Sequence, residues 1–334
     1  MMCNLAINRQ PISTPRHQRG VALITIMLVV AIATVIAAEL VSRVHFHIQR
    51  ATHQHAQAQA YQFALGGEEL IRQILYLDNE KTDYDHLNES WSKLKPQYEF
   101  DQGVLIIQVQ DLHARLNVNN LINTEGKPDE VVFKQFHQLF SQLSIDIGLL
   151  NTLIDWLDPD TTPIALNSED NGYLALDRPY RTANARLVHL SELTLLQGWD
   201  HATVAKLAPF ITALPGTTQI NVNTAPARVL ATLAKDFSVK AAENLAASRG
   251  PEGFDKIDAF LTHESLAGLE INASQASINS EYFAVYIESR FADRTIKLQT
   301  LVHRNASDGK IQLISRDRSS QYLWPQSEPD AESG

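Results

Sequence analysis

The chain has 334 residues, of which 44% are hydrophobic and 20% are charged, and its formal net charge is −10. This length allows two or three compact units, and the composition excludes wholesale disorder. The acidic balance argues against broad, nonspecific binding of nucleic acid, which needs a basic surface. The single cysteine, Cys3, lies in a segment that we expect to be removed. Loops of the mature protein would then be held by something other than disulfide bonds, such as a metal ion.

The N-terminal region predicts a membrane anchor. Residues 1–20 contain three arginines and no acid, and residues 21–41 are apolar apart from Thr25, Thr34 and one charge, Glu39. Twenty-one helical residues span roughly 31 Å, which matches the bilayer core of about 30 Å. Basic residues before such a segment hold that end in the cytoplasm, so we expect the rest of the chain to lie outside.

Two ordinary interpretations of this segment stay open. A secretory signal would have a shorter apolar region and would end at a small-x-small cleavage site. The pairs Ala31 with Ala33 and Val35 with Ala37 match such a site only weakly. The other interpretation is an uncleaved signal anchor.

A third interpretation rests on Arg19 and Gly20, which stand directly before the uninterrupted apolar run that begins at Val21. This arrangement resembles the prepilin cleavage motif of type IV pilins and type II secretion pseudopilins. The resemblance implies cleavage after Gly20 on the cytoplasmic side. It also implies that Val21 is the N-methylated first residue of the mature protein, whose apolar helix becomes the filament core.

Thr25 departs from that family pattern, because most such proteins have glutamate as the fifth mature residue. In the family, this glutamate is thought to pair with the free amino terminus of the neighbouring subunit above. A carboxylate in the bilayer is costly without such a partner. A hydroxyl residue at this position therefore suits a subunit that has no neighbour above it, at the tip of a filament.

Beyond the apolar segment, the pattern stays helical to about Leu77, and Gly66 and Gly67 are a place where this helix could bend. Residues 98–109 predict a hairpin with its turn at 101–103, and residues 281–302 and 310–315 predict further strands. The residues between these strands are mostly helical in pattern. A helical insertion within a small sheet domain fits this order.

We therefore predict an α+β fold: a type IV pilin-like long N-terminal helix and an antiparallel sheet, with a large inserted all-α domain that is SAM-like or helix-hairpin-helix-like. The predicted division of the chain is a leader at 1–20, a transmembrane helix at 21–41, a pilin-like helix and first strands at 42–111, an inserted helical domain at 112–275, C-terminal strands at 276–318 and a disordered tail at 319–334.

Two short stretches of the chain echo each other. Residues 115–119 read RLNVN and residues 219–223 read QINVN, and each precedes a helical pattern. Two unrelated strand-to-helix connections would explain the echo. We favour the other explanation, two related helical units.

An acidic loop is the main candidate site. Residues 155–177 contain six carboxylates and no lysine or arginine. Carboxylates crowded in a loop repel one another unless a cation neutralises them. Counted from Asp158, residues Asp160, Thr162 and Glu169 fall at the third, fifth and twelfth positions, as oxygen ligands do in an EF-hand. Pro163 stands where the EF-hand has glycine, so this loop is not an EF-hand. We predict that it holds calcium in a different geometry.

The predicted metal ligands are Asp158, Asp160, Glu169 and Asp170, followed by Asp155 and Asp177. One alternative is a solvated acidic loop. Another is a pair of catalytic carboxylates, as in a glycosidase, but the sequence has no aromatic-rich pattern typical of a sugar cleft.

Several further segments complete a resemblance that covers nearly the whole chain in order. They are Asp155-Trp156-Leu157-Asp158-Pro159-Asp160, Ser168-Glu169-Asp170-Asn171-Gly172-Tyr173, Arg178-Pro179-Tyr180-Arg181-Thr182-Ala183-Asn184, Leu190-Ser191-Glu192-Leu193 and Ile220-Asn221-Val222-Asn223-Thr224-Ala225-Pro226. With the N-terminal motif, this set resembles the minor pseudopilin K family of the type II secretion system, also called general secretion pathway protein K.

The resemblance implies a bacterial protein with a single pass through the inner membrane and most of its chain in the periplasm. It implies bound structural calcium and a place at the tip of the pseudopilus, in support of protein export across the outer membrane. The implied partners are the minor pseudopilins I and J, other pseudopilins, the prepilin peptidase and the inner-membrane secretion platform, with secreted proteins as further candidates.

A membrane-anchored DNA receptor is the rival interpretation. Residues 193–214 resemble half of a helix-hairpin-helix unit with its turn at Gly198, and such hairpins offer backbone amides to phosphates. However, residues 151–215 contain eight acids and four bases, which opposes phosphate binding, so we expect no nucleic acid partner. No enzyme is expected either, because the sequence lacks G-x-S-x-G, P-loop and G-x-G-x-x-G signatures.

Overall fold

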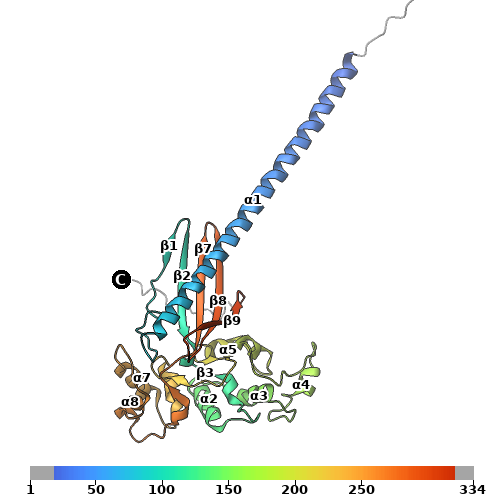
Figure 1. Cartoon of the computed structure of the whole chain (residues 1–334). Coiled ribbons are helices and arrows are strands. Elements are labelled where there is room, and N and C mark those ends of the chain that lie inside the picture. Colours follow the sequence, from blue (N-terminus) through green and yellow to red (C-terminus); the bar gives the residue numbers. More distant parts are fainter. Residues whose placement is uncertain (1–18, 320–334) are drawn as a thin grey trace, which may run out of the picture. The chain divides into compact units, whose positions relative to one another are not determined.

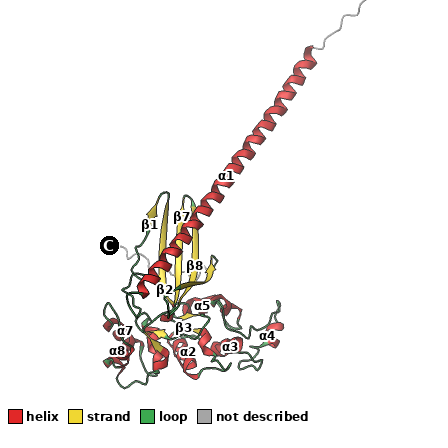
Figure 2. Cartoon of the chain, viewed as in Figure 1, coloured by secondary structure: helices red, strands yellow, loops and turns green. Residues whose placement is uncertain are grey.

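The computed structural model describes residues 19–319 (Figures 1 and 2). The chain forms two units, which divide between Ala56 and Gln57. Most of the predicted leader and nearly all of the predicted C-terminal tail lie outside the described residues. Helix α1, Arg19–Asn79, runs through Gly66 and Gly67 without a break in its helical conformation.

In the first unit, the side chains from Val21 to His55 are exposed. The part of α1 from Val21 onward has the length and composition needed to cross a membrane. A run of exposed apolar side chains of this kind needs lipid or another protein around it in place of water.

The second unit contains a five-stranded antiparallel sheet with the strand order β1-β2-β7-β8-β9. The strands are β1 Tyr98–Phe100, β2 Gly103–Asp111, β7 Tyr282–Phe291, β8 Arg294–Arg304 and β9 Ile311–Asp317. These positions confirm the predicted strands at both ends of this unit. Neighbours β2 and β7 pair from Gly103 opposite Phe291 to Asp111 opposite Phe283, so everything between Asp111 and Tyr282 is an insertion at one end of the sheet.

The C-terminal part of α1 packs on one face of this sheet. Ala60, Ala64 and Ile71 share a buried apolar cluster with alternate residues of the strands, including Val285 and Ile287. A buried carboxylate adds a polar link. Glu68 accepts hydrogen bonds from the guanidinium of Arg316 at 2.7 and 2.8 Å and from the Thr300 hydroxyl at 2.9 Å.

The inserted region carries a core of its own, in which large side chains such as Phe136, Phe140 and Leu153 are fully buried. Most of its elements are short, and they gather beyond one end of the sheet (Figure 2). Its helices are α2 Glu130–Gln142, α3 Gly148–Leu157, α4 Asp170–Leu174, α5 His201–Leu207, α6 Ala227–Leu230, α7 Val239–Ser248 and α8 Ile257–Leu261, with 3-10 turns η1 Leu112–Ala114, η2 Val118–Leu121, η3 Leu190–Leu195, η4 Ala231–Leu233, η5 Glu264–Leu266 and η6 Ala273–Gln275.

Four short strands make two parallel pairs in the same region: β3 Leu116–Asn117 pairs with β4 Ile211–Thr212, and β5 Ile220–Asn221 pairs with β6 Ala276–Ser277. The prediction of an all-α insertion was therefore incomplete, because two-residue strands leave no periodicity in a sequence. Strands β3 and β5 lie within the two echoing stretches, so each stretch forms a short strand of a parallel pair.

The long helix can approach the sheet closely because residue 67 is glycine. A Cβ atom at Gly67 would lie 2.9 Å from Leu105 Cδ2 and 3.2 Å from Ile107 Cδ1, whereas a Cβ atom at Gly66 would meet open space. A branched side chain at position 67 would therefore have to push the sheet away.

We expect Gly67→Val to lower the free energy of unfolding of the full-length chain by about 2 kcal/mol, since overpacking a tight core costs about 1–3 kcal/mol. Gly66→Ala is the matched control and should raise it by about 0.5–1 kcal/mol through helix propensity. Chemical denaturation in detergent, followed by circular dichroism, measures both changes. Equal stability of the two variants would show that the helix and sheet are not in close contact.

Candidate functional site

The acidic loop is folded around one buried carboxylate, Asp155, in the last turns of α3. Its oxygens accept hydrogen bonds from the backbone N–H groups of Ile164, at 2.9 and 3.0 Å, and Ala165, at 2.9 Å, and from the Ser168 hydroxyl. Asp155 therefore shapes the path of the loop, and its acceptor capacity is largely used by the chain itself.

Three carboxylates converge beside it. Asp158 ends α3 as its C-cap, Asp160 follows two residues later, and Glu169 is the N-cap of α4. One oxygen atom from each of these three side chains lies within 4.8 Å of the other two. Asp158 and Glu169 are buried, whereas Asp160 is exposed. The site is thus open to solvent on the side of Asp160.

The donor set of this cluster fits a hard cation. Within the described part of the chain, Asp158 Oδ1 and Glu169 Oε1 are buried and have no hydrogen-bond partner. A buried acceptor without a partner costs about 1–3 kcal/mol. Calcium binds oxygen ligands at about 2.3–2.6 Å, so ligands on opposite sides of the ion lie about 5 Å apart. Asp158, Asp160 and Glu169 could therefore hold a calcium ion.

Burial and neighbouring charges raise the pKa of two of these carboxylates. Burial raises the pKa of Asp158 to about 6, and the charges of Asp160, Asp155 and Glu169 add to the effect. Burial, with a contribution from Asp155, also raises the pKa of Glu169. Both shifts mean that the ionised cluster is costly in the absence of a positive charge.

The other two predicted ligands lie elsewhere. Asp170 stands in the first turn of α4, where it accepts hydrogen bonds from the backbone N–H and hydroxyl of Thr182 and from Arg181. Asp177 is exposed in the following loop. The structure thus brings three of the six predicted ligands together, around a neighbouring Asp155.

The sequence-based prediction assigned no role to two residues that close the loop from a distant segment. Asn184 donates a hydrogen bond to the backbone carbonyl of Asp160 at 2.7 Å, and the Thr182 hydroxyl lies 3.4 Å from Glu169 Oε2. Both residues belong to the segment 178–184, but nothing in its spacing indicates which side chains turn toward the acids.

The hairpin on which the DNA-receptor interpretation rests is present, with Gly198 in the left-handed region at φ 83°. The N-terminus of the following helix α5 is filled, however, because Asp200 is its N-cap and accepts a hydrogen bond from the backbone N–H of Thr203 at 2.7 Å. A carboxylate occupies the place that a phosphate would need, which disfavours this interpretation.

Comparisons with known proteins agree with the fold. Two family models, both described as "Type II secretion system (T2SS), protein K", match residues 114–216 and 220–279. The type II secretion system protein K of Pseudomonas aeruginosa is 37% identical over 315 residues, which cover 90% of this chain and 93% of that protein. The chain belongs to the protein K family.

Other relatives and one solved structure extend this result. The type II secretion system protein K of Klebsiella pneumoniae is 30% identical and covers 80% of this chain. A chain in the crystal structure of the GspK-GspI-GspJ complex from the enterotoxigenic Escherichia coli type 2 secretion system matches with a TM-score of 0.71 at 24% identity, over 80% of this chain and 98% of that chain. It confirms the pilin-like α+β fold with helical insertions. Protein K family members are structural, non-enzymatic components of the secretion system, and so is this chain.

The raised pKa of Asp158 has a consequence for stability. Because the folded-state value of about 6 exceeds the ordinary value of 3.8, the folded state holds this proton more tightly than the unfolded state. This group therefore makes the chain less stable as the pH rises from about 4 to above 6. In a chelator and well above pH 6, Asp158→Asn should be more stable than the unaltered chain by about 1 kcal/mol, with the difference vanishing near pH 4.

Thermal unfolding of the full-length chain in detergent measures this effect, and excess calcium should reverse the order by stabilising the unaltered chain more than the variant. Asp177→Asn is the control, since Asp177 lies outside the cluster, and it should behave like the unaltered chain in both conditions. An Asp158→Asn variant whose stability follows that of the unaltered chain at every pH would contradict this account of the cluster.

Proposed function

We propose that this protein is a minor pseudopilin that caps the tip of the type II secretion pseudopilus and so supports protein export across the outer membrane. The observation that carries the proposal is the insertion between neighbouring strands β2 and β7. A region with its own core at one end of the sheet would obstruct the stacking of another subunit there. In this proposal, the pilin-like domain comprises residues 42–111 and 276–318, and the capping domain comprises residues 112–275.

The N-terminal region supports assembly through the membrane. We propose that a prepilin peptidase removes residues 1–20 and that Val21 becomes N-methylated. The mature helix would then be stored in the inner membrane, with the bulk of the chain in the periplasm. The Thr25 hydroxyl donates a hydrogen bond to the carbonyl of Val21 at 2.9 Å, within its own helix. Position 25 therefore needs no partner from a neighbour, which suits a terminal subunit.

The partners follow from the same proposal. The solved structure that this fold resembles is a complex of GspK with GspI and GspJ. We propose that this chain assembles with the corresponding minor pseudopilins I and J, above the other pseudopilins of the filament. The inner-membrane secretion platform is a further proposed partner, and secreted proteins are candidate contacts of the tip.

A structural calcium ion is proposed for the acidic loop, with Asp158, Asp160 and Glu169 as ligands. The orphan oxygens of Asp158 and Glu169 support this assignment. The ion would balance the cluster and hold the loop in a chain that has a single cysteine. Its energy of binding would add to the stability of the inserted region.

Processing is tested by the N-terminal sequence and intact mass of the membrane-extracted protein. We expect a start at methylated Val21 when the protein is produced with a prepilin peptidase, and a start at the leader without it. Gly20→Ala should leave the leader in place, because the resemblance assigns cleavage to that glycine. The same N-terminus with and without the peptidase would leave an uncleaved signal anchor or an ordinary secretory signal.

Tip capping is tested by the position of the protein in assembled pseudopili. An epitope inserted at the exposed residues 306–308, detected by immunogold on filaments from an otherwise complete system, should mark filament ends. A tag on a shaft pseudopilin is the control and should mark the whole length. Gold distributed along the shaft for this chain as well would contradict capping.

A further inference from the structure

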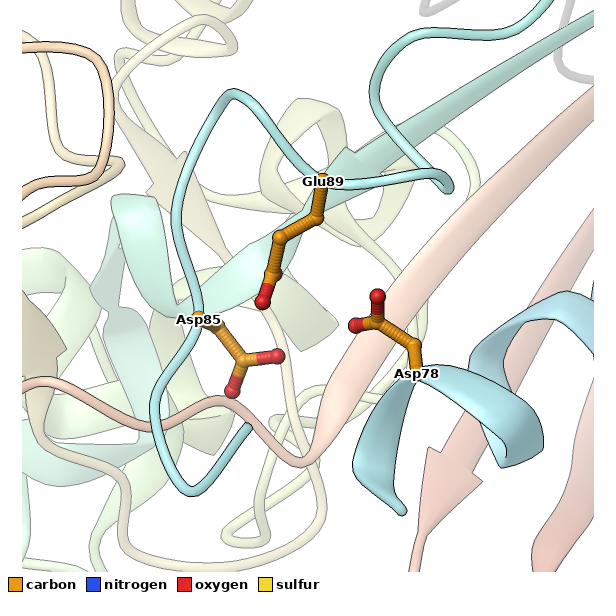
Figure 3. Close-up of side chains that lie close together, drawn as sticks. All are labelled: Asp78, Asp85 and Glu89. Atoms are coloured by element: carbon orange, nitrogen blue, oxygen red, sulfur yellow. The ribbon is translucent and has the colours of Figure 1, made fainter. Parts of the chain in front are cut away.

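A second group of buried carboxylates lies outside the acidic loop. Asp78 belongs to the last turn of α1, and Asp85 and Glu89 belong to the connection that follows it. Their exposed fractions are 4%, 2% and 7%. Figure 3 shows the three side chains pointing toward one another from these separate backbone positions, and one oxygen from each lies within 4.8 Å of the other two.

The charges of this cluster are not balanced. Arg304 Nη2 donates to both oxygens of Asp85 at 2.5 Å, and Arg304 Nη1 is 3.9 Å from Asp78 Oδ2. The ring of His86 approaches Glu89 only to 3.8 Å. With three carboxylates against one guanidinium, the ionised cluster has a formal charge of −2, in a place with almost no solvent.

Asp78 supplies an independent sign of a missing partner. Among the described residues, its Oδ2 atom is buried and has no hydrogen-bond partner, although it points into the cluster. The other two carboxylates are better provided for. Asp85 also accepts from the Ser280 N–H at 2.7 Å, and Glu89 accepts from the Thr82 hydroxyl at 2.8 Å and the Trp91 indole at 2.7 Å. The unmet demand is thus concentrated at Asp78.

The position of Asp78 on its helix adds to this demand. The C-terminal end of a helix carries a partial negative charge and favours cations, yet the last turn of α1 contains Asp78 and no basic residue. Burial, followed by the charge of Glu89, raises the pKa of Asp78 to about 6. The helix dipole, the burial and the neighbouring carboxylates all favour a positive charge beside Asp78.

A polar cavity borders the cluster at Asp85. It has a volume of about 330 Å³, and Asp85 and Arg304 line it together with Thr82, Asp83, Ser280 and Glu281. Water ligands of an ion bound to Asp85 could extend into this cavity.

We propose that Asp78, Asp85 and Glu89 form a binding site for a divalent cation of the size of calcium. The ion fastens the end of α1 to the connection at 80–97. Through Arg304 and Ser280, both in contact with Asp85, it also fastens α1 to the point where the chain returns from the insertion to the sheet. This site uses none of the residues of the acidic loop, and it does not depend on the proposed capping function.

The ligand chemistry favours calcium. Calcium accepts oxygen ligands in flexible geometry, whereas magnesium demands a nearly octahedral arrangement and keeps several water ligands. One oxygen from each of the three carboxylates lies within 4.8 Å of the other two, so a single ion could contact all three. The formal charge of −2 equals the charge that one divalent cation would neutralise.

Calcium counting on the full-length chain in detergent tests the proposal. After equilibrium dialysis against calcium, Asp78→Asn and Glu89→Gln should each bind one equivalent per chain less than the unaltered protein. Both changes remove a charge with little change of shape, so the metal-free fold should be kept. Asp83→Asn, an exposed acid in the same connection, is the matched control and should bind as much as the unaltered protein.

Terbium luminescence provides a second measurement, since Trp91 contacts Glu89 and can transfer energy to a bound terbium ion. Trp91→Phe should reduce tryptophan-sensitised luminescence while the number of calcium equivalents stays the same. To separate the two sites, the same titrations are run on Asp158→Asn, which should lose a different equivalent from Asp78→Asn, so that their combination loses both.

Calcium binding by Asp78→Asn and Glu89→Gln equal to that of the unaltered chain would overturn the proposal and leave a proton shared between carboxylates as the occupant of the cluster. Unchanged terbium luminescence in Trp91→Phe would overturn it as well. Neither result bears on processing at Val21 or on the position of the protein in the filament, which are measured separately.

Discussion

Pairing of β2 with β7 is the constraint on which the second unit depends. These strands are neighbours in the sheet, but residues 112–281 separate them in the chain. The entropic cost of closing a loop grows only slowly with its length, and an insertion that folds on its own adds little further cost. The inserted region meets this condition, because its buried side chains form a cluster separate from the one between α1 and the sheet. A large domain can therefore stand at the end of a small pilin-like sheet without weakening it.

The two ends of the insertion are held together by buried polar groups. Asp111, the last residue of β2, accepts hydrogen bonds from the hydroxyls of Ser280 and Thr224 and from the side-chain amide of Asn221. Asn221 in turn donates to the backbone carbonyl of Asp85. Such directional contacts fix the insertion relative to the sheet in a way that apolar packing alone would not. The proposed second cation site lies beside this network, through Asp85.

The echoing stretches show that one local design serves twice. In each, an asparagine side chain closes a short turn, as Asn117 does for the N–H of Asn119 and Asn221 does for the N–H of Asn223. The second asparagine then binds both the N–H and the carbonyl of a distant backbone: Asn119 binds those of Leu187, and Asn223 binds those of Phe254. This repeated geometry favours two related units. The two family models, which match residues 114–216 and 220–279, likewise divide the insertion between the two echoing stretches.

The sequence predicted those features that depend on local pattern. The exposed apolar helix follows from the length and composition of the segment 21–41, and the strands at both ends of the second unit and the helical insertion follow from periodicity and turn residues. In the acidic loop, the spacing of Asp158, Asp160 and Glu169 predicted three side chains that do converge. The same reasoning could not separate them from Asp155, whose oxygens are used by backbone N–H groups, because that depends on the path of the loop.

The second carboxylate cluster had no local signal at all. Asp78 ends a helix, Asp85 and Glu89 lie in an irregular connection, and their counter-charge, Arg304, comes from the last residue of β8, more than 200 positions later. Only the folded sheet brings these groups together. Both clusters nevertheless have the same physical basis. They lie where separate segments of a chain with a single cysteine meet. Burial raises the pKa of Asp78 and of Asp158, so ionising either cluster without a cation is unfavourable. An ion at either place would neutralise the carboxylates and link the segments that carry them. The free energy of metal binding would then add to the free energy of folding.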